Sequence, residues 1–336
     1  MRKTLVLAAV AGGILLARRR YEWRDRVVLV AGGSRGLGLL LARRFGRRGA
    51  KVVLAARSRD ELEAARSELE AKGISVHVVV ADVAVEEQAF AMVEEAVRRF
   101  GRLDVLVNAA SIIQVAPLEA TSLQDLHAAL DVNFWGTVHA CWAALPHLAQ
   151  QRGSRIVNIS SIGGVVSVPH LFAYCCGKFA VTGFSQGLQA EVEKDGVRVV
   201  TIVPGLMRTG STGHALVKGN RAAEAALFHL AGSLPVITLA GERAADRIVR
   251  AAERGERFVT LGVFGKTLRI ANALAPGLAG AALGLVARLL PSADEMASIE
   301  EPSEAREHAS AWTRSPLTLL GRRAAVQNNE LGPGPS

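Results

Sequence analysis

Cysteine, aromatic residues and charge are all scarce in this chain of 336 residues. The three cysteines, Cys141, Cys175 and Cys176, lack the number and spacing of a disulfide framework or a zinc site, so we expect a reducing compartment and no bound metal. Charged residues make up 21% and hydrophobic residues 50%, which excludes an intrinsically disordered chain. The 33 glycines follow no three-residue period and no longer repeat is found, which excludes collagen and solenoid folds.

Excess positive charge is concentrated at the N-terminus. The formal net charge is +9, and residues 1–26 hold seven Lys or Arg residues against two acidic ones, a local charge of +5 that leaves +4 for the other 310 residues. Aromatic residues amount to 5% and do not alternate with basic ones, so we expect no nucleic-acid groove.

Residues 1–25 form a short apolar and basic segment. Residues 5–16 are uncharged and lie between Arg2-Lys3 and the arginines at 18–20. As a helix they would reach about 18 Å, short of the roughly 30 Å hydrocarbon core of a bilayer. A secretory signal fits poorly because arginines stand where a cleavage site should be. We expect this segment to hold the protein at the cytoplasmic side of a membrane, with a helix packed on the protein body as the alternative.

Residues 26–262 show short β-branched runs that alternate with longer amphipathic stretches. This pattern predicts a Rossmann-type α/β fold, in which a doubly wound sheet of seven parallel strands is covered by helices on both faces. The expected strands are 27–30, 52–56, 76–80, 105–107, 156–160, 197–203 and 258–261. The expected helices are 37–48, 59–72, 85–100, one within 121–150, 172–194 and 241–253.

The turn after the first strand reads Ala-Gly-Gly-Ser-Arg-Gly-Leu-Gly over residues 31–38. Glycines between a strand and a helix let the backbone approach a pyrophosphate, which the helix N-terminus stabilises through free N–H groups and its dipole. The spacing Gly32-x3-Gly36-x-Gly38 resembles the glycine signature of the short-chain dehydrogenase/reductase family.

The end of the second strand bears on the choice of cofactor. It reads Ala-Ala-Arg-Ser over residues 55–58, with no acidic residue to bind a ribose 2′-hydroxyl. Arg57 and Arg35 stand where members of the family that this chain resembles bind a 2′-phosphate, so we expect NADP(H) rather than NAD(H). The resemblance also places Asp82 and its neighbour Val83 at the adenine, although an acidic helix cap would look the same.

The resemblance extends over residues 26–262 through further motifs in the family's order. These are Asn108-Ala109-Ala110-Ser111 after the fourth strand, Asn133 in the sequence Asp-Val-Asn-Phe-Trp-Gly, Ser161 after the fifth strand, Tyr174-x3-Lys178 thirteen residues later, and Pro204-Gly205 through Thr209 after the sixth strand. The resemblance implies a catalytic set of Asn133, Ser161, Tyr174 and Lys178. It implies cofactor contacts at Gly32, Ser34, Arg35, Gly36, Leu37, Gly38, Arg57, Asp82, Val83, Asn108, Ala109, Tyr174, Lys178, Pro204, Gly205 and Thr209.

Tyr174 and Lys178 lie four residues apart, so on a helix both side chains project from one face. A nearby ammonium would lower the pKa of the tyrosine toward neutrality. By resemblance, Tyr174 exchanges a proton with the substrate oxygen as hydride moves, Ser161 binds that oxygen, and Asn133 supports a water-linked proton path. Lys178 would also hold the nicotinamide ribose.

Several residues depart from the family pattern or stand near the expected site. Ala31 replaces a threonine, Ser111 replaces a glycine beside the cofactor, and Gly177 replaces a serine, which lowers helix propensity by up to about 1 kcal/mol. His170 and His214 are near enough to touch substrate, but we expect them to be solvated loop residues.

Residues 263–336 form a C-terminal extension of apolar helices and then a partly disordered tail. Residues 270–287 carry no charge, and Pro276-Gly277 predicts two short helices rather than a membrane span. Substrate identity should reside here and in residues 206–240, which are suited to an apolar lid. We expect a homodimer or homotetramer, because the family builds dimers from the helices within 121–150 and 172–194.

The sequence thus favours an NADP(H)-dependent oxidoreductase that acts on a hydrophobic ketone, aldehyde or secondary alcohol. Two alternatives stay open, since fold alone does not fix function. One is an isomerase or dehydratase that uses the same tyrosine, and the other is a non-catalytic, membrane-associated NADPH-binding protein. The intact set of four catalytic residues argues against the second.

Overall fold

The computed structural model describes residues 21–235, 237–293, 301–308, 310, 313 and 315–331. The expected membrane anchor at residues 5–16 lies outside these residues. The described helices include none that is long and apolar enough to cross a membrane.

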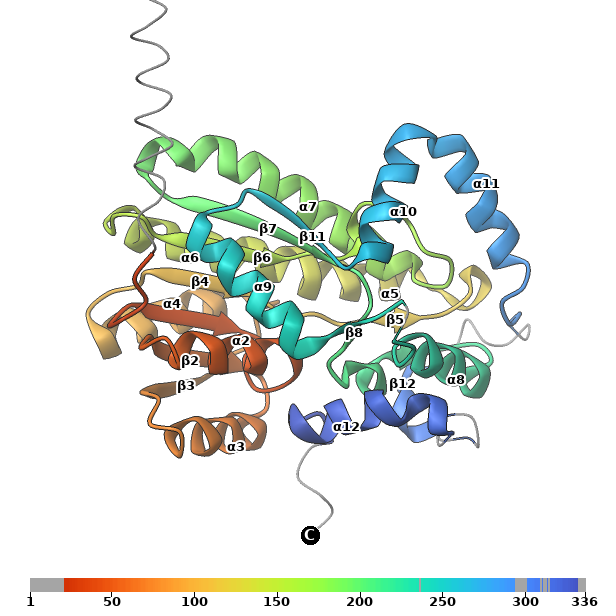
Figure 1. Ribbon diagram of the computed structural model, residues 1–336, viewed down its shortest axis with the longest axis horizontal. Helices are drawn as coiled ribbons and strands as arrows, with labels where there is room; N and C mark the ends of the chain where they lie inside the picture. Colours follow the sequence, from red (N-terminus) through yellow and green to blue (C-terminus); the bar gives the residue numbers. More distant parts are fainter. Residues whose placement is uncertain are drawn as a thin grey trace, which may run out of the picture.

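A seven-stranded sheet forms the centre of the molecule (Figure 1). Its spatial order is β3-β2-β1-β4-β6-β7-β11, and every neighbouring pair is parallel, which confirms the predicted fold. The strands are β1 (Val27–Ala31), β2 (Lys51–Ala56), β3 (Val76–Val80), β4 (Val105–Asn108), β6 (Arg155–Ile159), β7 (Arg198–Pro204) and β11 (Phe258–Leu261).

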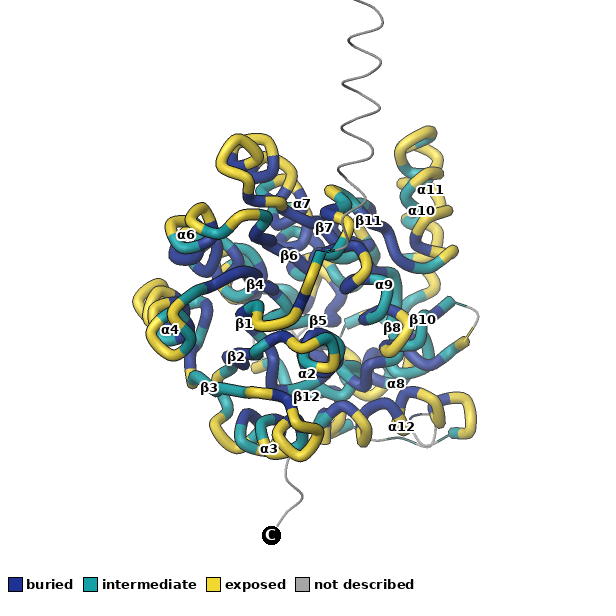
Figure 2. The backbone as a smooth tube through the Cα atoms, turned by 60° about the vertical axis from the view of Figure 1, so that its left-hand side comes forward, coloured by how far each residue is buried: buried dark blue, intermediate teal, exposed yellow. Residues whose placement is uncertain are grey.

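Helices cover both faces of the sheet because its strands are apolar on both sides. Successive residues of β1 point to opposite faces, so Val28 and Val30 join one core cluster while Val27 and Leu29 join the other. The first face is covered by α2 (Gly36–Gly46), α3 (Arg59–Glu70) and α9 (Gly241–Arg254). The second is covered by α4 (Glu86–Phe100), α6 (Gly136–Ala149) and α7 (Phe172–Val192). Figure 2 shows the buried strands between these layers.

The long helix expected within residues 121–150 is divided into three parts. Helix α5 (Leu123–Leu130) begins at a capping box made by Ser122 and Asp125, and a π-helical turn, Asp131–Trp135, joins it to α6. Such turns are common at functional sites, and this one contains Asn133.

A smaller sheet covers the region after the strands' carboxyl ends. Strand β9 (Leu216–Val217) pairs in parallel with β5 (Gln114–Val115) and antiparallel with β12 (Ser303–Glu304). Helix α8 (Arg221–Ala231) packs on it through an apolar cluster of Val115, Ala215, Val217, Ala225 and Ala305. A two-stranded pair, β8 (Met207–Arg208) with β10 (Leu239–Ala240), connects this smaller sheet to the main body.

The C-terminal extension begins with the two predicted short helices. Helix α10 (Val263–Leu274) ends just before Pro276, the first residue of α11 (Pro276–Ala287). Proline is favoured at that first position because its missing N–H is not needed there. Helix α11 has no buried residue, and Figure 2 shows both helices standing out from the body with much of their surface exposed.

The described residues after 300 include a short strand and a helix. Residues 303–304 form β12, and α12 (Leu319–Gln327) packs back on the body. Close packing holds α12 there, since a Cβ on Gly210 would lie 2.7 Å from the nitrogen of Ala325.

Candidate active site

The glycine-rich turn joins β1 to α2 beside the point where the strand order reverses. Gly32 has φ +81°, and a Cβ on it would lie 2.5 Å from the nitrogen of Ala110, while a Cβ on Gly38 would overlap the carbonyl oxygen of Gly32. Only glycine fits either position. The turn therefore brings the N-terminus of α2 close to the carboxyl ends of β1 and β4, where open α/β sheets bind their ligands.

The two arginines expected at a 2′-phosphate differ in their surroundings. The Arg57 side chain is 66% exposed, with its guanidinium 3.9 Å from the carboxylate of Asp82. Arg35 lies between two carboxylates, 3.5 Å from Glu61 and 3.4 Å from Glu330. Neither acidic partner is expected from the sequence. A local pattern places Glu61 at the start of α3, because Ser58 stands three residues before it as the helix cap and accepts its backbone N–H.

The other residues expected near the adenine and ribose are held by local contacts. Asp82 accepts a hydrogen bond from the N–H of Ala84, and the side chain of Val83 is buried against Gly136. The N–H of Ala109 donates to the carbonyl of Ala31, which ties the two strand ends together.

Asn108 belongs to a buried polar chain within the sheet. Its Nδ2 donates to Asn158 Oδ1 at 2.8 Å, Asn158 donates to Ser185 Oγ at 3.1 Å, and Thr201 donates to Ser185 at 2.8 Å. The Asn108 side chain thus links β4 to β6 beneath the site rather than standing open beside it.

Ser161, Tyr174 and Lys178 meet after the carboxyl end of β6. Ser161 caps a short 3₁₀ turn by accepting the N–H of Gly163 at 3.1 Å, and it hydrogen-bonds Tyr174. Lys178 is 3% exposed, and its ammonium lies 5.7 Å from the centre of the Tyr174 ring while donating to the carbonyl of Ile159 at 3.0 Å. The structure brings these three predicted residues together.

Burial controls the acidity of this cluster. It raises the pKa of Tyr174 to about 12, against the opposing effect of the Ser161 hydrogen bond, and it lowers the pKa of Lys178 to about 7. The prediction that the pKa of Tyr174 is lowered toward neutrality is therefore wrong. The physical reason is that the ammonium is directed at the Ile159 carbonyl and is itself desolvated.

Asn133 is fully buried in the π-helical turn, with its amide committed to the loop after β4. Its Oδ1 accepts from Ser111 Oγ at 2.7 Å and from the N–H of Ile112 at 3.1 Å, and its Nδ2 donates to the Ile112 carbonyl at 3.0 Å. The unusual Ser111 thus bonds Asn133. Gly177 also has a packing role, since a Cβ there would lie 3.1 Å from the Cβ of Asn133.

The loop expected at the nicotinamide follows β7. Pro204 pairs with Leu261 at the strand end, and the N–H of Gly205 donates to the Leu261 carbonyl at 3.2 Å. Thr209 is 3% exposed; its hydroxyl bonds Ser211 and its carbonyl accepts from Asn328 Nδ2 at 2.9 Å.

The prediction that His170 and His214 are solvated is wrong. His170 Nδ1 lies 2.7 Å from the buried carboxylate of Glu224 on α8, and His214 Nε2 lies 2.7 Å from the carbonyl of Glu330. These partners are 54 and 116 residues away, a separation at which no local pattern indicates a contact.

Comparisons with known proteins agree with this geometry. The profile of the family described as short chain dehydrogenase matches residues 26–217. The chain is 37% identical over 239 residues to 11-beta-hydroxysteroid dehydrogenase A of Sesamum indicum, which covers 70% of this chain and 68% of that protein. It is 30% identical over 252 residues to 11-beta-hydroxysteroid dehydrogenase-like 3 of Arabidopsis thaliana, which covers 73% of this chain and 77% of that protein.

An uncharacterized oxidoreductase of Staphylococcus saprophyticus is 34% identical over 193 residues, or 57% of this chain and 82% of that protein. The parallel sheet, the glycine-rich turn and these matches have one explanation. The chain belongs to the short-chain dehydrogenase/reductase family of oxidoreductases, which use NAD or NADP.

Proposed function

We propose that the protein is an NADP(H)-dependent oxidoreductase that transfers hydride between nicotinamide and a hydrophobic ketone, aldehyde or secondary alcohol. The observation that carries the proposal is the meeting of Ser161, Tyr174 and a buried Lys178 at the carboxyl end of β6. The same end of the sheet holds the glycine-rich turn, so proton donor and cofactor would face one reaction volume.

The residues present fit a dinucleotide. Gly32 and Gly38 allow the tight turn that places the N-terminus of α2 at the carboxyl ends of β1 and β4, and that N-terminus favours an anion. The Lys178 ammonium has three N–H groups, of which one donates to Ile159, so others can reach ribose hydroxyls. When bound, NADPH supplies the hydride.

Tyr174 then acts as the proton donor. Because burial raises its pKa to about 12, its hydroxyl stays protonated at neutral pH and can protonate a substrate carbonyl oxygen in the reductive direction. Ser161, already bonded to Tyr174, holds that same oxygen. Lys178 lies beside the Tyr174 ring, and the reverse transfer serves alcohol oxidation.

The preference for NADP(H) rests on charge at the adenosine end. No acidic residue follows β2 directly, and Arg57 presents a largely exposed guanidinium there. Arg35 adds a second positive charge, which Glu61 partly offsets. A 2′-phosphate would gain charge-assisted hydrogen bonds that a 2′-hydroxyl could not match.

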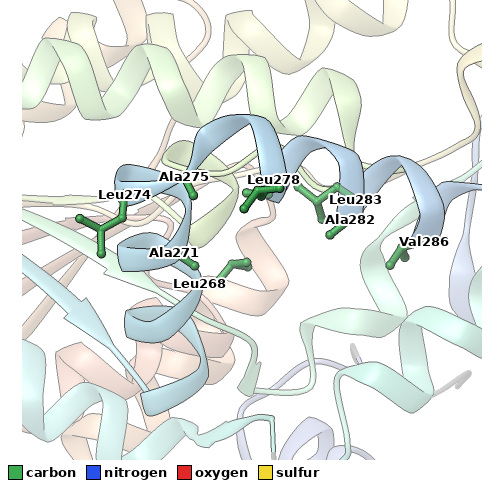
Figure 3. Close-up of a pocket in the computed structure, with 9 residues that line it drawn as sticks. Leu268, Ala271, Leu274, Ala275, Leu278, Ala282, Leu283 and Val286 are labelled. Atoms are coloured by element: carbon green, nitrogen blue, oxygen red, sulfur yellow. The ribbon is translucent and has the colours of Figure 1, made fainter.

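The hydrophobic substrate class rests on the apolar hairpin of α10 and α11. This hairpin follows the carboxyl end of β11 directly, and Asn272 of α10 donates to the Val165 carbonyl just beyond Ser161. Only Leu, Ala and Val residues line its inner hollow of about 440 Å³ (Figure 3). The hydroxysteroid in the names of two relatives is an apolar ring alcohol, which agrees with this class.

We extend the proposal to two associations. The basic and apolar residues 1–25, together with the exposed α11, would hold the protein at the cytoplasmic side of a membrane. A dimer or tetramer would cover the exposed Trp142 of α6 and Phe179 of α7. Flotation with vesicles, and light scattering of the detergent-free protein, test the two separately.

The reaction itself is tested by NADPH oxidation with medium-chain aldehydes, cyclic ketones and sterol-like ketones, run beside NADH. We expect turnover that prefers NADPH and collapses in Lys178→Met. Product formed without net NADPH consumption would favour an isomerase or dehydratase instead. Binding of NADPH without turnover of any carbonyl would favour a non-catalytic NADPH-binding protein.

A further inference from the structure

The C-terminal residues 328–330 are bonded to the glycine-rich turn, nearly 300 residues away in sequence. The N–H of Gly36 donates to the carbonyl of Asn328 at 2.9 Å. Asn329 Nδ2 donates to the carbonyl of Ser34 at 3.1 Å and to that of Glu61 at 3.3 Å. Glu330, the next residue, also contacts the turn through Arg35, so three successive residues of the tail lie against it.

Glu330 brings a carboxylate to the place where a cofactor phosphate is expected. It is 4% exposed, it lies 3.4 Å from the guanidinium of Arg35, and a Cβ on Gly36 would overlap its carboxylate oxygen. In dinucleotide-binding turns the second glycine is the one that lets the backbone approach the pyrophosphate. The space that Gly36 leaves free is therefore filled by an anion belonging to the chain itself.

The tail also reaches the loop expected on the other side of the cofactor. Asn328 Nδ2 donates to the carbonyl of Thr209 at 2.9 Å, and Arg43 of α2 donates to Asn328 Oδ1 at 3.0 Å. His214 Nε2 lies 2.7 Å from the carbonyl of Glu330. Residues 328–330 thus connect α2 and its glycine-rich turn to the loop after β7.

The surroundings of the Glu330 carboxylate indicate that the contact between the tail and the turn can be released. Burial raises the pKa of Glu330 to about 7, and the nearby carboxylates of Glu61 and Glu304 act in the same direction while Arg35 opposes them. A carboxylate in such surroundings is held less favourably than one in water. A phosphate that met Arg35 and the α2 N-terminus would be a stronger anion for the same groups.

We propose that residues 328–330 are an intramolecular competitor of the dinucleotide, with the Asn328 carbonyl and the Glu330 carboxylate occupying groups that the cofactor's phosphates need. This inference rests on the proposed cofactor site. Cofactor and tail cannot both use the Gly36 N–H and the space above it, so the cofactor binds only the fraction of molecules whose tail is undocked. The apparent dissociation constant rises as that fraction falls.

The direct test is the dissociation constant of NADPH, measured by titration of its fluorescence. A chain ending at Gln327 keeps α12 and loses the competitor. We expect it to bind NADPH about 10-fold to 100-fold more tightly than the full chain, which is the gain expected if the tail is docked in about 90–99% of full-length molecules. Asn328→Ala, which removes the bonds to Thr209 and Arg43, should shift binding in the same direction by less. Glu307→Ala is the matched control, because it removes an exposed carboxylate from the same extension and should change nothing.

Amide hydrogen exchange of residues 319–331 in the full chain provides a second readout. Saturating NADPH should speed exchange there if the tail is displaced, whereas slower exchange would show a clamp over bound cofactor and overturn the proposal. Equal NADPH affinity in the full chain, the shortened chain and Asn328→Ala would also overturn it. If none of the three binds NADPH or NADH, the cofactor site itself is misassigned and both proposals fail.

Discussion

The pair of His170 and Glu224 should hold α8 to the segment before Tyr174. His170 precedes Tyr174 by four residues, and Glu224 lies on α8. Their side chains are 12% and 3% exposed, and the bonded atoms are 2.7 Å apart. His170 also has φ +63°, an uncommon conformation for a non-glycine residue, which shows that tertiary contacts fix it.

His170→Ala removes one hydrogen bond to a buried carboxylate and leaves that carboxylate without its imidazole. Hydrogen bonds to charged groups contribute about 1.5–3 kcal/mol, and an unmatched buried charge adds to the loss, so we expect the free energy of unfolding to fall by about 3 kcal/mol. Urea unfolding of wild type, His170→Ala, Glu224→Gln and the double variant gives the coupling directly. A coupling energy of less than about 0.5 kcal/mol would refute the reasoning, because it would make the two residues independent.

Three further predictions concern the proposed cofactor site and Lys178. Arg57→Ala should weaken NADPH binding by roughly 10-fold to 100-fold and leave NADH binding unchanged, by fluorescence titration, since only the 2′-phosphate loses charge-assisted bonds; equal losses for both would contradict it. Gly38→Ala should lower the melting temperature by roughly 3–10 °C, because the added methyl overlaps the Gly32 carbonyl; an unchanged melting curve would count against the tight turn. Burial lowers the pKa of Lys178 from 10.5 to about 7. The buried charge therefore destabilises the cofactor-free protein: the full effect is present at pH values below 7, and none remains above about pH 10.5. Lys178→Met should therefore be the more stable protein at pH 6–7, by at most about 5 kcal/mol, with the difference shrinking toward pH 10; a difference that does not vary with pH would contradict it.

The sheet and the positions of the proposed catalytic side chains could be predicted because their signals are local. Short β-branched apolar runs such as residues 52–56 favour strands buried on both faces, and the four-residue spacing of Tyr174 and Lys178 places both on one helix face. The break before Pro276 follows from proline's own geometry. Each of these features depends on residues close together in the chain.

Contacts between segments that are far apart in the chain could not be predicted from the sequence. Nothing around Glu330 or Asn328 indicates that they bond the turn at Gly36, and residues 303–304 are too short a strand to show a period of two. The π-helical turn at Asn133 is equally hidden, because the flanking helices have one continuous pattern. The raised pKa of Tyr174 does not follow from the sequence, since spacing reveals a neighbouring ammonium but not how deeply both groups are buried.

Replacing one oxygen atom tests the central claim most directly. Tyr174→Phe keeps the ring beside Lys178 and removes only the hydroxyl that Ser161 bonds. With a carbonyl substrate that wild type reduces, we predict that kcat for NADPH oxidation falls by roughly 100-fold to 10,000-fold while the dissociation constant of NADPH stays within about twofold. A variant that retains wild-type kcat would contradict the account, because proton donation would then come from another group.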